Sequence, residues 1–243
     1  MDTNYTKDIF SHNSLVDYYD NITFKFSLLR SELLIFQKYV ALEAHILDIG
    51  CGAGRTTLGL YKAGYHNIIG VDIAEAMIKR AEQNAQRANV PVYFQVGDAV
   101  DLHFSDNSFD CVSFSFNGIM SIPSVDNRIK ACAEAFRVLK NGGCFIFSTP
   151  FLDNKIERES WQERLKETEI APDSPNFGDM VLDDYGVEHI YMHIPFIKEV
   201  EEMLRKTHFT TQEHLQRITI CEEDESVENE LDDNMVWVAY KNE

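Results

Sequence analysis

Long apolar runs are missing from this sequence. No stretch approaches the roughly 18 consecutive apolar residues that a membrane-spanning helix needs, so no membrane span is expected. The first ten residues, MDTNYTKDIF, contain neither the basic region nor the apolar region of a secretory signal. The sequence therefore predicts a cytoplasmic protein that does not bind membranes.

Paired cysteines and positive charge are also scarce. The five cysteines form no C-x-x-C pair, and their odd number and scattered positions argue against a disulfide framework and against a metal site. The 22 Lys and Arg residues are outnumbered by 40 Asp and Glu residues, which gives a net charge of −18. Such a surface repels phosphate backbones and disfavours nucleic acid as a partner.

The most informative segment that is present covers residues 46–55, ILDIGCGAGR. An apolar run typical of a buried strand ends there, three glycines follow at alternate positions, and a helical pattern begins at Arg55. Glycines allow a close approach of the backbone to a ligand and positive φ angles. Their spacing places the third glycine one residue earlier than in a dinucleotide fingerprint. The segment predicts a cradle for a nucleotide-like ligand.

Strand and helix patterns alternate after this segment. Strands are expected over residues 45–49, 67–71, 92–96, 109–115, 143–148, 209–220 and 235–240. Helices are expected over residues 26–40, 55–64, 74–88, 126–140 and 196–207. Alternation of this kind predicts an α/β fold of three layers, in which a doubly wound, mainly parallel seven-stranded sheet carries an antiparallel last hairpin strand, a Rossmann-like arrangement.

The remaining segments lack a clear period. Residues 1–20 are polar with scattered aromatics and are expected to be poorly fixed, residues 151–190 are expected to be irregular, and residues 222–233 are expected to form a solvated loop. We divide the chain into an N-terminal helical cap segment (1–40), a ligand-binding core (41–150), an insertion that serves as a substrate lid (151–194), and the final helix and C-terminal hairpin of the same domain (195–243).

Three further motifs follow at the ends of the predicted strands. Asp72 ends the second strand 22 positions after Gly50, close to the offset of an acid that binds ribose hydroxyls. Asp98 and Ala99 follow the third strand, the sequence FDCV opens the fourth at residue 109, and RVLKNGG occupies residues 137–143.

Together with the pattern D-x-G-x-G-x-G over residues 48–54, these motifs resemble the class I S-adenosylmethionine (SAM)-dependent methyltransferases, in the small-molecule branch called type 11 or type 25. The resemblance covers residues 46–150 and leaves out 1–25 and 151–190. It implies that SAM is the cofactor, that Asp48 meets its amino group and that Asp98 and Ala99 meet its adenine. The predicted cofactor-binding set is Asp48, Gly50, Cys51, Gly52, Asp72, Ile73, Met77, Asp98, Ala99, Ser115 and Phe116.

The resemblance implies transfer of a methyl group to a small-molecule acceptor by direct displacement. Such a step needs no fixed catalytic residue, because the cofactor carries the activated methyl group. The family's N-P-P-[YF] motif for amino groups of bases or glutamine is absent, since the chain has SFNG at residues 115–118. Predicted acceptor-binding residues are Tyr18, Tyr19, Asn117, Met120, Trp161 and Tyr191.

Two histidines and a tyrosine are candidates for a general base. His189 and His193 lie in an alternating segment, residues 187–194, which predicts an extended strand with both rings on one face. Tyr19 is the third candidate.

Alternative functions remain open at this point. They are an NAD-dependent oxidoreductase, a methyltransferase acting on tRNA or protein, and a regulatory protein that binds SAM without catalysis. The chain is expected to be a monomer or a homodimer.

Overall fold

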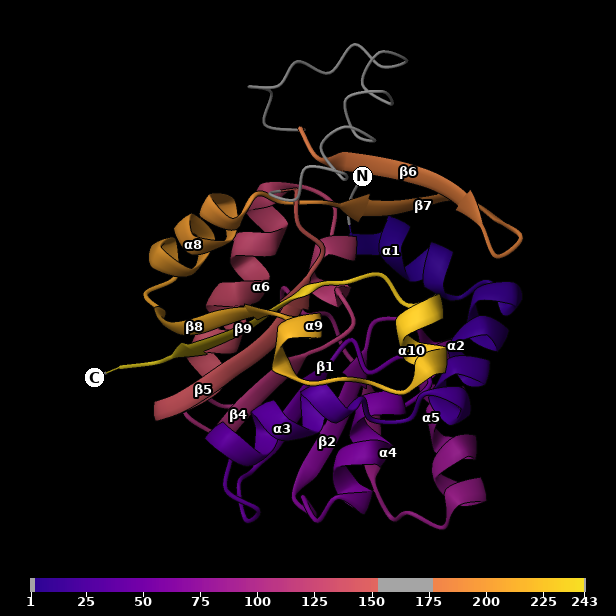
Figure 1. Cartoon of the computed structure of the whole chain (residues 1–243), viewed down its shortest axis with the longest axis horizontal. Helices are drawn as coiled ribbons and strands as arrows, with labels where there is room; N and C mark the ends of the chain where they lie inside the picture. The colour runs from indigo at the N-terminus through magenta and orange to yellow at the C-terminus, as the bar shows by residue number, and fades with distance from the viewer. Residues whose placement is uncertain (1–2, 153–176, 243) are drawn as a thin grey trace.

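The computed structural model describes residues 3–152 and 177–242, and its centre is a seven-stranded sheet in the order β3-β2-β1-β4-β5-β9-β8 (Figure 1). The first five strands pair in parallel, whereas β9 lies antiparallel between β5 and β8. Their bounds are Ile46–Ile49 (β1), Ile68–Asp72 (β2), Tyr93–Val96 (β3), Phe109–Phe114 (β4), Leu139–Thr149 (β5), Thr210–Gln216 (β8) and Met235–Tyr240 (β9). The predicted fold class is confirmed.

Helices cover both faces of this sheet because its central strands are apolar on both sides. On one face, the core joins alternate strand residues such as Ile46 to α3 (Arg30–Tyr39) and α4 (Arg55–Lys62). On the other face, residues such as Leu47 pack with α6 (Val125–Val138) and α8 (Ile197–Lys206). The helix α5 (Glu75–Ala88) packs through Ala81 on Phe94 of the edge strand β3. The three predicted layers are present.

The N-terminal residues are ordered helices, so the expectation of a poorly fixed segment is wrong for residues 3–20. The helices are α1 (Thr3–Phe10) and α2 (Asn13–Lys25). Leu15 and Val16 of α2 are buried against Met77 of α5 and Ile190. These partners are distant in sequence, which is why the local pattern did not reveal the order.

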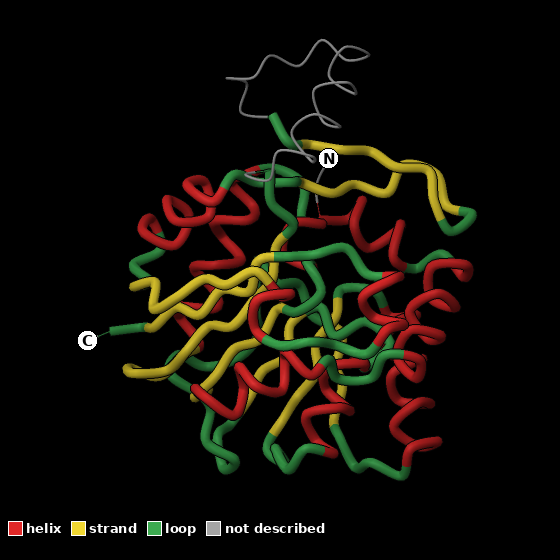
Figure 2. Tube along the Cα trace, viewed as in Figure 1, coloured by secondary structure: helices red, strands yellow, loops and turns green. Residues whose placement is uncertain are grey.

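The insertion also contains regular structure. Its described part forms an antiparallel hairpin of β6 (Asp179–Asp184) and β7 (Val187–His193), which lies apart from the main sheet and close to α1 (Figures 1 and 2). The expectation of an irregular segment is therefore wrong for these residues.

Two short helices also depart from the sequence patterns. The predicted strand 209–220 stops at Gln216, where α9 (Arg217–Ile220) begins, and the expected loop 222–233 contains α10 (Glu225–Glu230). Val227 of α10 is buried against Ile22 of α2. Within residues 3–152 and 177–242, no helix combines the length and the apolar character needed to cross a bilayer.

Candidate functional site

The glycine turn after β1 forms the floor of the site. Gly50, Gly52 and Gly54 all have positive φ angles, of +62°, +53° and +94°. A Cβ atom at Gly50 would lie 2.6 Å from Cε2 of Phe114, so both the conformation and the space require glycine there. The turn thus brings bare backbone to the carboxyl end of the sheet, where ligands of open α/β folds bind.

Asp72 ties this turn to the next helix. The backbone N–H of Gly52 donates to Oδ2 of Asp72, and the N–H of Ala74 donates to Oδ1, each at 2.9 Å. The carboxylate is 7% exposed. Burial raises its pKa to about 6, although the backbone donors act in the opposite direction.

A cavity of about 700 Å³, open to solvent, lies above the turn. The ends of β1 to β4 form its base, while Thr6 and Phe10 of α1 and Tyr19 of α2 cover it. The structure brings together here most of the predicted cofactor-binding set: Gly50, Gly52, Asp72, Ile73, Met77, Asp98, Ala99, Ser115 and Phe116.

Asp48 and Cys51, also in the predicted set, do not line this cavity. Asp48 is buried and accepts a hydrogen bond of 2.5 Å from the hydroxyl of Thr57 on α4. Burial raises the pKa of Asp48 to about 6. The Cys51 side chain packs with Leu58 and Phe94 in the core, and burial raises the pKa of its thiol. In this structure the two residues support the turn from behind.

A largely buried ion pair contacts the cover of the cavity through Phe116. Arg55 of α4 contacts Glu32 of α3 at 2.6 Å, and its guanidinium lies 4.8 Å from the ring centroid of Phe116. Phe116 in turn meets Tyr19 edge to face, with ring centroids 6.5 Å apart. Nothing in the sequence marks Thr6 and Phe10 as lining residues, because no motif accompanies α1.

A second, larger cavity continues from the first. It measures about 1260 Å³, is open to solvent and lies between α2, the β6–β7 hairpin and the segment 217–234. Four residues line both cavities: Phe10, Tyr19, Phe116 and Ser121. The two spaces are therefore adjacent compartments of one site.

The predicted acceptor-binding residues divide between this second cavity and the core. Tyr18, Tyr19 and Asn117 line the cavity. Met120 is buried in the main core, and the hydroxyl of Tyr191 is bound to Arg128 and Asp179, so neither lines either of the two cavities. Trp161 lies outside the described residues.

The two candidate histidines lie outside both cavities. Both belong to β7, as the extended pattern predicted, but they do not share one environment. The side chain of His189 is 67% exposed at a φ of +63°, while His193 is fully buried. His193 contacts Asp179 through Nδ1 and Glu199 through Nε2, each at 2.7 Å. Burial lowers the pKa of His193, but the two carboxylates outweigh it, so the pKa is raised overall.

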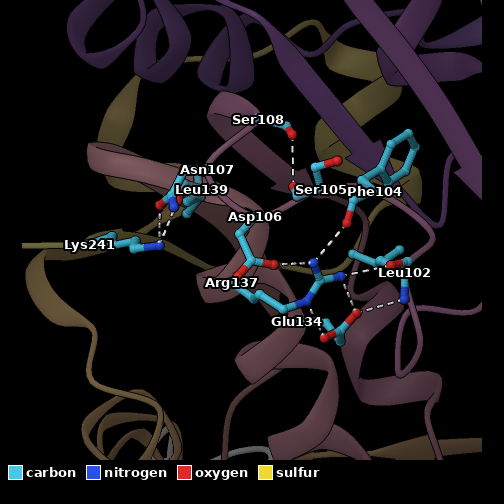
Figure 3. Close-up of polar contacts among 10 residues, drawn as sticks. All are labelled: Leu102, Phe104, Ser105, Asp106, Asn107, Ser108, Glu134, Arg137, Leu139 and Lys241. Atoms are coloured by element: carbon cyan, nitrogen blue, oxygen red, sulfur yellow. Dashed lines mark hydrogen bonds and ion pairs between the residues drawn. The ribbon is translucent and has the colours of Figure 1, made fainter.

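Arg137 of the RVLKNGG segment has a supporting role (Figure 3). Its guanidinium is bound to the carboxylates of Glu134 and Asp106 and to the carbonyl oxygens of Leu102 and Phe104. These contacts fasten α6 to the loop that follows Asp98 and Ala99. The segment therefore holds one wall of the first cavity in place without reaching it.

Comparison with known proteins identifies the domain that carries the first cavity. Residues 46–143 match the family described as a methyltransferase domain. A curated relative, the demethylmenaquinone methyltransferase of Lactiplantibacillus plantarum, is 35% identical over 133 residues, which are 52% of this chain and 54% of that protein. The chain thus spans about half the length of this curated relative.

Solved structures share the architecture over most of the chain. A Pyrococcus horikoshii protein is 26% identical, with a TM-score of 0.67, and the match covers 93% of this chain and 91% of that one. A SAM-dependent methyltransferase of Methanosarcina mazei is 24% identical, with a TM-score of 0.70, and the match covers 86% and 97% of the two chains. At that identity, the second likeness establishes the fold alone.

Proposed function

Because residues 46–143 make this chain a member of the methyltransferase-domain family, with SAM as its cofactor, we propose that it transfers a methyl group from SAM to a small-molecule acceptor. The observation that carries the proposal is the pair of adjacent cavities with four shared lining residues. A transfer reaction needs two ligands side by side, and this arrangement offers one compartment for each.

In this proposal the first cavity holds SAM along the edge of the sheet. The backbone of Gly50 and Gly52 borders the methionine part, and the carboxylate of Asp72 accepts from the ribose hydroxyls. Asp98 and the backbone of Ala99 meet the adenine. The fit is supported by Asp72, because two backbone N–H groups hold its carboxylate at the rim of the cavity.

The protein contributes alignment and the exclusion of water to the reaction. When bound, SAM would supply a methyl group activated by a positively charged sulfur, which an electron pair of the acceptor could displace. Phe10, Tyr19, Phe116 and Ser121 border the position where the two compartments meet. Burial raises the pKa of Tyr19, so its hydroxyl stays protonated.

The second cavity favours an aromatic acceptor. Its wall includes Phe10, Tyr18, Tyr19, Phe116 and Tyr185, and the rings of Tyr18 and Tyr185 are stacked with centroids 3.9 Å apart. Flat rings pack well against such surfaces. The relative named as a demethylmenaquinone methyltransferase points to the same class of acceptor, a substituted aromatic or quinol ring.

The hairpin serves as the lid over this acceptor. It contributes Met180, Asp184, Tyr185, Ile190 and Met192 to the cavity wall. In the division of the chain that we propose, residues 41–150 bind the cofactor and residues 177–194 of the insertion close over the acceptor, while residues 153–176 lie outside the described residues.

The experiment that tests the function combines binding with turnover. Calorimetry should detect binding of SAM in a 1:1 ratio and no binding of NAD. A panel of catechols, naphthols and quinols, incubated with methyl-labelled SAM, should yield labelled product with at least one member. Binding of NAD in place of SAM would contradict the proposal. SAM binding with label transferred only to tRNA or protein, or to no acceptor, would instead support the alternative functions.

A further inference from the structure

The acceptor cavity contains a buried arginine with no counter-ion among the described residues. Arg217 is 2% exposed and lines the cavity from the start of α9. Its Nη2 donates to the carbonyl oxygen of Leu231 at 3.1 Å, with a longer contact of 3.5 Å to that of Asp232. Within the described chain, its Nε and Nη1 have no acceptor, and no carboxylate lies within ion-pair distance.

The other two buried arginines show how unusual this is. Arg55 is paired with Glu32 at 2.6 Å, and Arg128 lies 3.8 Å from Glu199 and donates to the hydroxyl of Tyr191. Burying a guanidinium without an anion is costly, because the lost hydration is not replaced. Of the three buried arginines in the described part of the chain, only Arg217 has no carboxylate within ion-pair distance.

Two of the four acidic residues on this cavity, Asp233 and Glu230, are engaged with other groups. Oδ1 of Asp233 accepts from the backbone N–H groups of Ile218 and Asn234. Glu230, on the same cavity, pairs with Lys25. These contacts leave the buried guanidinium without a carboxylate partner among the described residues.

Two asparagines on the same cavity are incomplete as well. Oδ1 of Asn117 and Oδ1 of Asn234 are buried and have no donor among the described residues. Asn117 is fixed by its backbone, whose N–H donates to the hydroxyl of Ser148 at 3.0 Å. Unsatisfied polar groups inside a protein are rare, and the three residues that carry these groups line one cavity, where a polar ligand could supply their partners.

We propose that Arg217 binds an ionised oxygen of the acceptor, either a carboxylate or a phenolate, and that Asn117 and Asn234 bind hydroxyl groups of the same molecule. The inference rests on the proposed function, and it narrows the acceptor to an aromatic ring that carries an acidic oxygen. Arg217 acts here as a specificity residue, because the charge it offers is met only by an anion.

The test compares probes that differ in charge and not in shape. Binding of 1-naphthoate and of its neutral counterpart 1-naphthamide is measured by calorimetry, and 4-nitrophenol is measured below and above its own pKa. We expect naphthoate to bind about tenfold to 100-fold more tightly than naphthamide, the range that hydrogen bonds to a charged group supply. A preference for nitrophenolate over nitrophenol would assign the phenolate; a preference for naphthoate alone would assign the carboxylate.

The variant Arg217→Met should abolish this preference, with naphthamide affinity unchanged within about twofold. Because it removes an unpaired buried charge, it should also keep or raise the melting temperature of the protein without ligand. Arg217→Lys keeps the charge and should retain part of the preference. Arg205→Met is the matched control, since Arg205 lies on the surface of α8 and pairs with Glu202.

Two results would overturn the inference. One is equal affinity of the wild-type protein for each anion and its neutral counterpart. The other is a lower melting temperature in Arg217→Met together with a preserved preference for the anion. SAM titrations of the same proteins distinguish the two proposals. Absence of SAM binding would contradict the proposed methyltransferase function, whereas the preference for anions tests only the role of Arg217.

Discussion

Replacing Asp72 by asparagine should weaken SAM binding without destabilising the folded protein. Asp72 binds the ribose in our account, yet its carboxylate is buried and carries a pKa raised to about 6 from 3.8. Since the folded state holds the proton more tightly, the ionised carboxylate lowers the stability of the ligand-free protein above pH 6. That cost disappears as the pH falls from 6 toward 3.8.

The magnitudes decide the expected outcome. Raising the pKa of Asp72 from 3.8 to about 6 costs the ionised form about 3 kcal/mol, which asparagine would recover at pH 7. Against this, asparagine has one oxygen for the two backbone donors of Gly52 and Ala74, and the unpaired donor costs about 1–3 kcal/mol. The net change is between zero and about 2 kcal/mol in favour of the folded variant. Loss of charged acceptors for the ribose should weaken SAM binding by roughly 10- to 100-fold.

The assay is calorimetry with SAM together with thermal melts at pH 5 and pH 7.5. Asp110→Asn is the control, because Asp110 accepts from the backbone N–H of His45 at 2.8 Å and from Lys140, away from the cavity. We expect its SAM affinity to equal that of the wild type. An unchanged SAM affinity in Asp72→Asn would refute the reasoning, and so would a fall of many degrees in its melting temperature.

Three more predictions concern stability and the turn. His193→Ala should lose about 1–3 kcal/mol of unfolding free energy, because Asp179 and Glu199 each lose one hydrogen-bond partner, although Asp179 keeps the Tyr191 hydroxyl and Glu199 keeps Arg128 at 3.8 Å. The exposed His189→Ala should change it by less than about 0.5 kcal/mol; urea titration measures both. Because the pKa of His193 is raised in the folded state, its stabilising effect is full below pH 6.5 and is lost as the pH rises through the folded-state pKa. The melting temperature of the wild type should therefore fall more between pH 6 and 9 than that of His193→Ala. An equal fall in both proteins would count against the two ion pairs of His193 with Asp179 and Glu199. Gly50→Ala should abolish SAM binding and lower the melting temperature. Gly142→Ala is the control and should keep its SAM affinity, because Gly142 also has a positive φ but a new Cβ there would meet no atom within 4 Å. Retained SAM affinity in Gly50→Ala would contradict the described turn.

The sheet and the first cavity were predictable because their signals are local. Apolar runs and a glycine turn define β1 and the start of α4, and the carboxyl ends of parallel strands meet at one edge. Acids placed at those ends, Asp72 and Asp98, therefore converge even though 26 positions separate them in the sequence.

The direction of individual side chains was harder to predict. Asp48 and Cys51 lie beside cavity residues in the sequence, but their side chains point into the protein toward Thr57 and Leu58. A motif gives the position of a residue along the chain and not the side of the turn that it occupies.

The acceptor cavity was largely hidden from the sequence. Its wall combines Phe10, Phe116, Tyr185 and Arg217, which come from segments that meet only in the folded chain. No motif accompanies Phe10, Tyr185 or Arg217, and the helix α1 and the hairpin that position Phe10 and Tyr185 are stabilised by contacts distant in sequence. Arg217 stands out only once its burial and its missing counter-ion are known.

A crystal structure of the complex with S-adenosylhomocysteine would test the proposed placement of the cofactor most directly. We expect density in the first cavity, with the ribose hydroxyls on the carboxylate of Asp72 and the adenine beside Asp98 and Ala99. The sulfur should face the boundary residues Tyr19 and Phe116 and the second cavity. Density at another place, or a ligand with its sulfur turned away from the second cavity, would contradict the account.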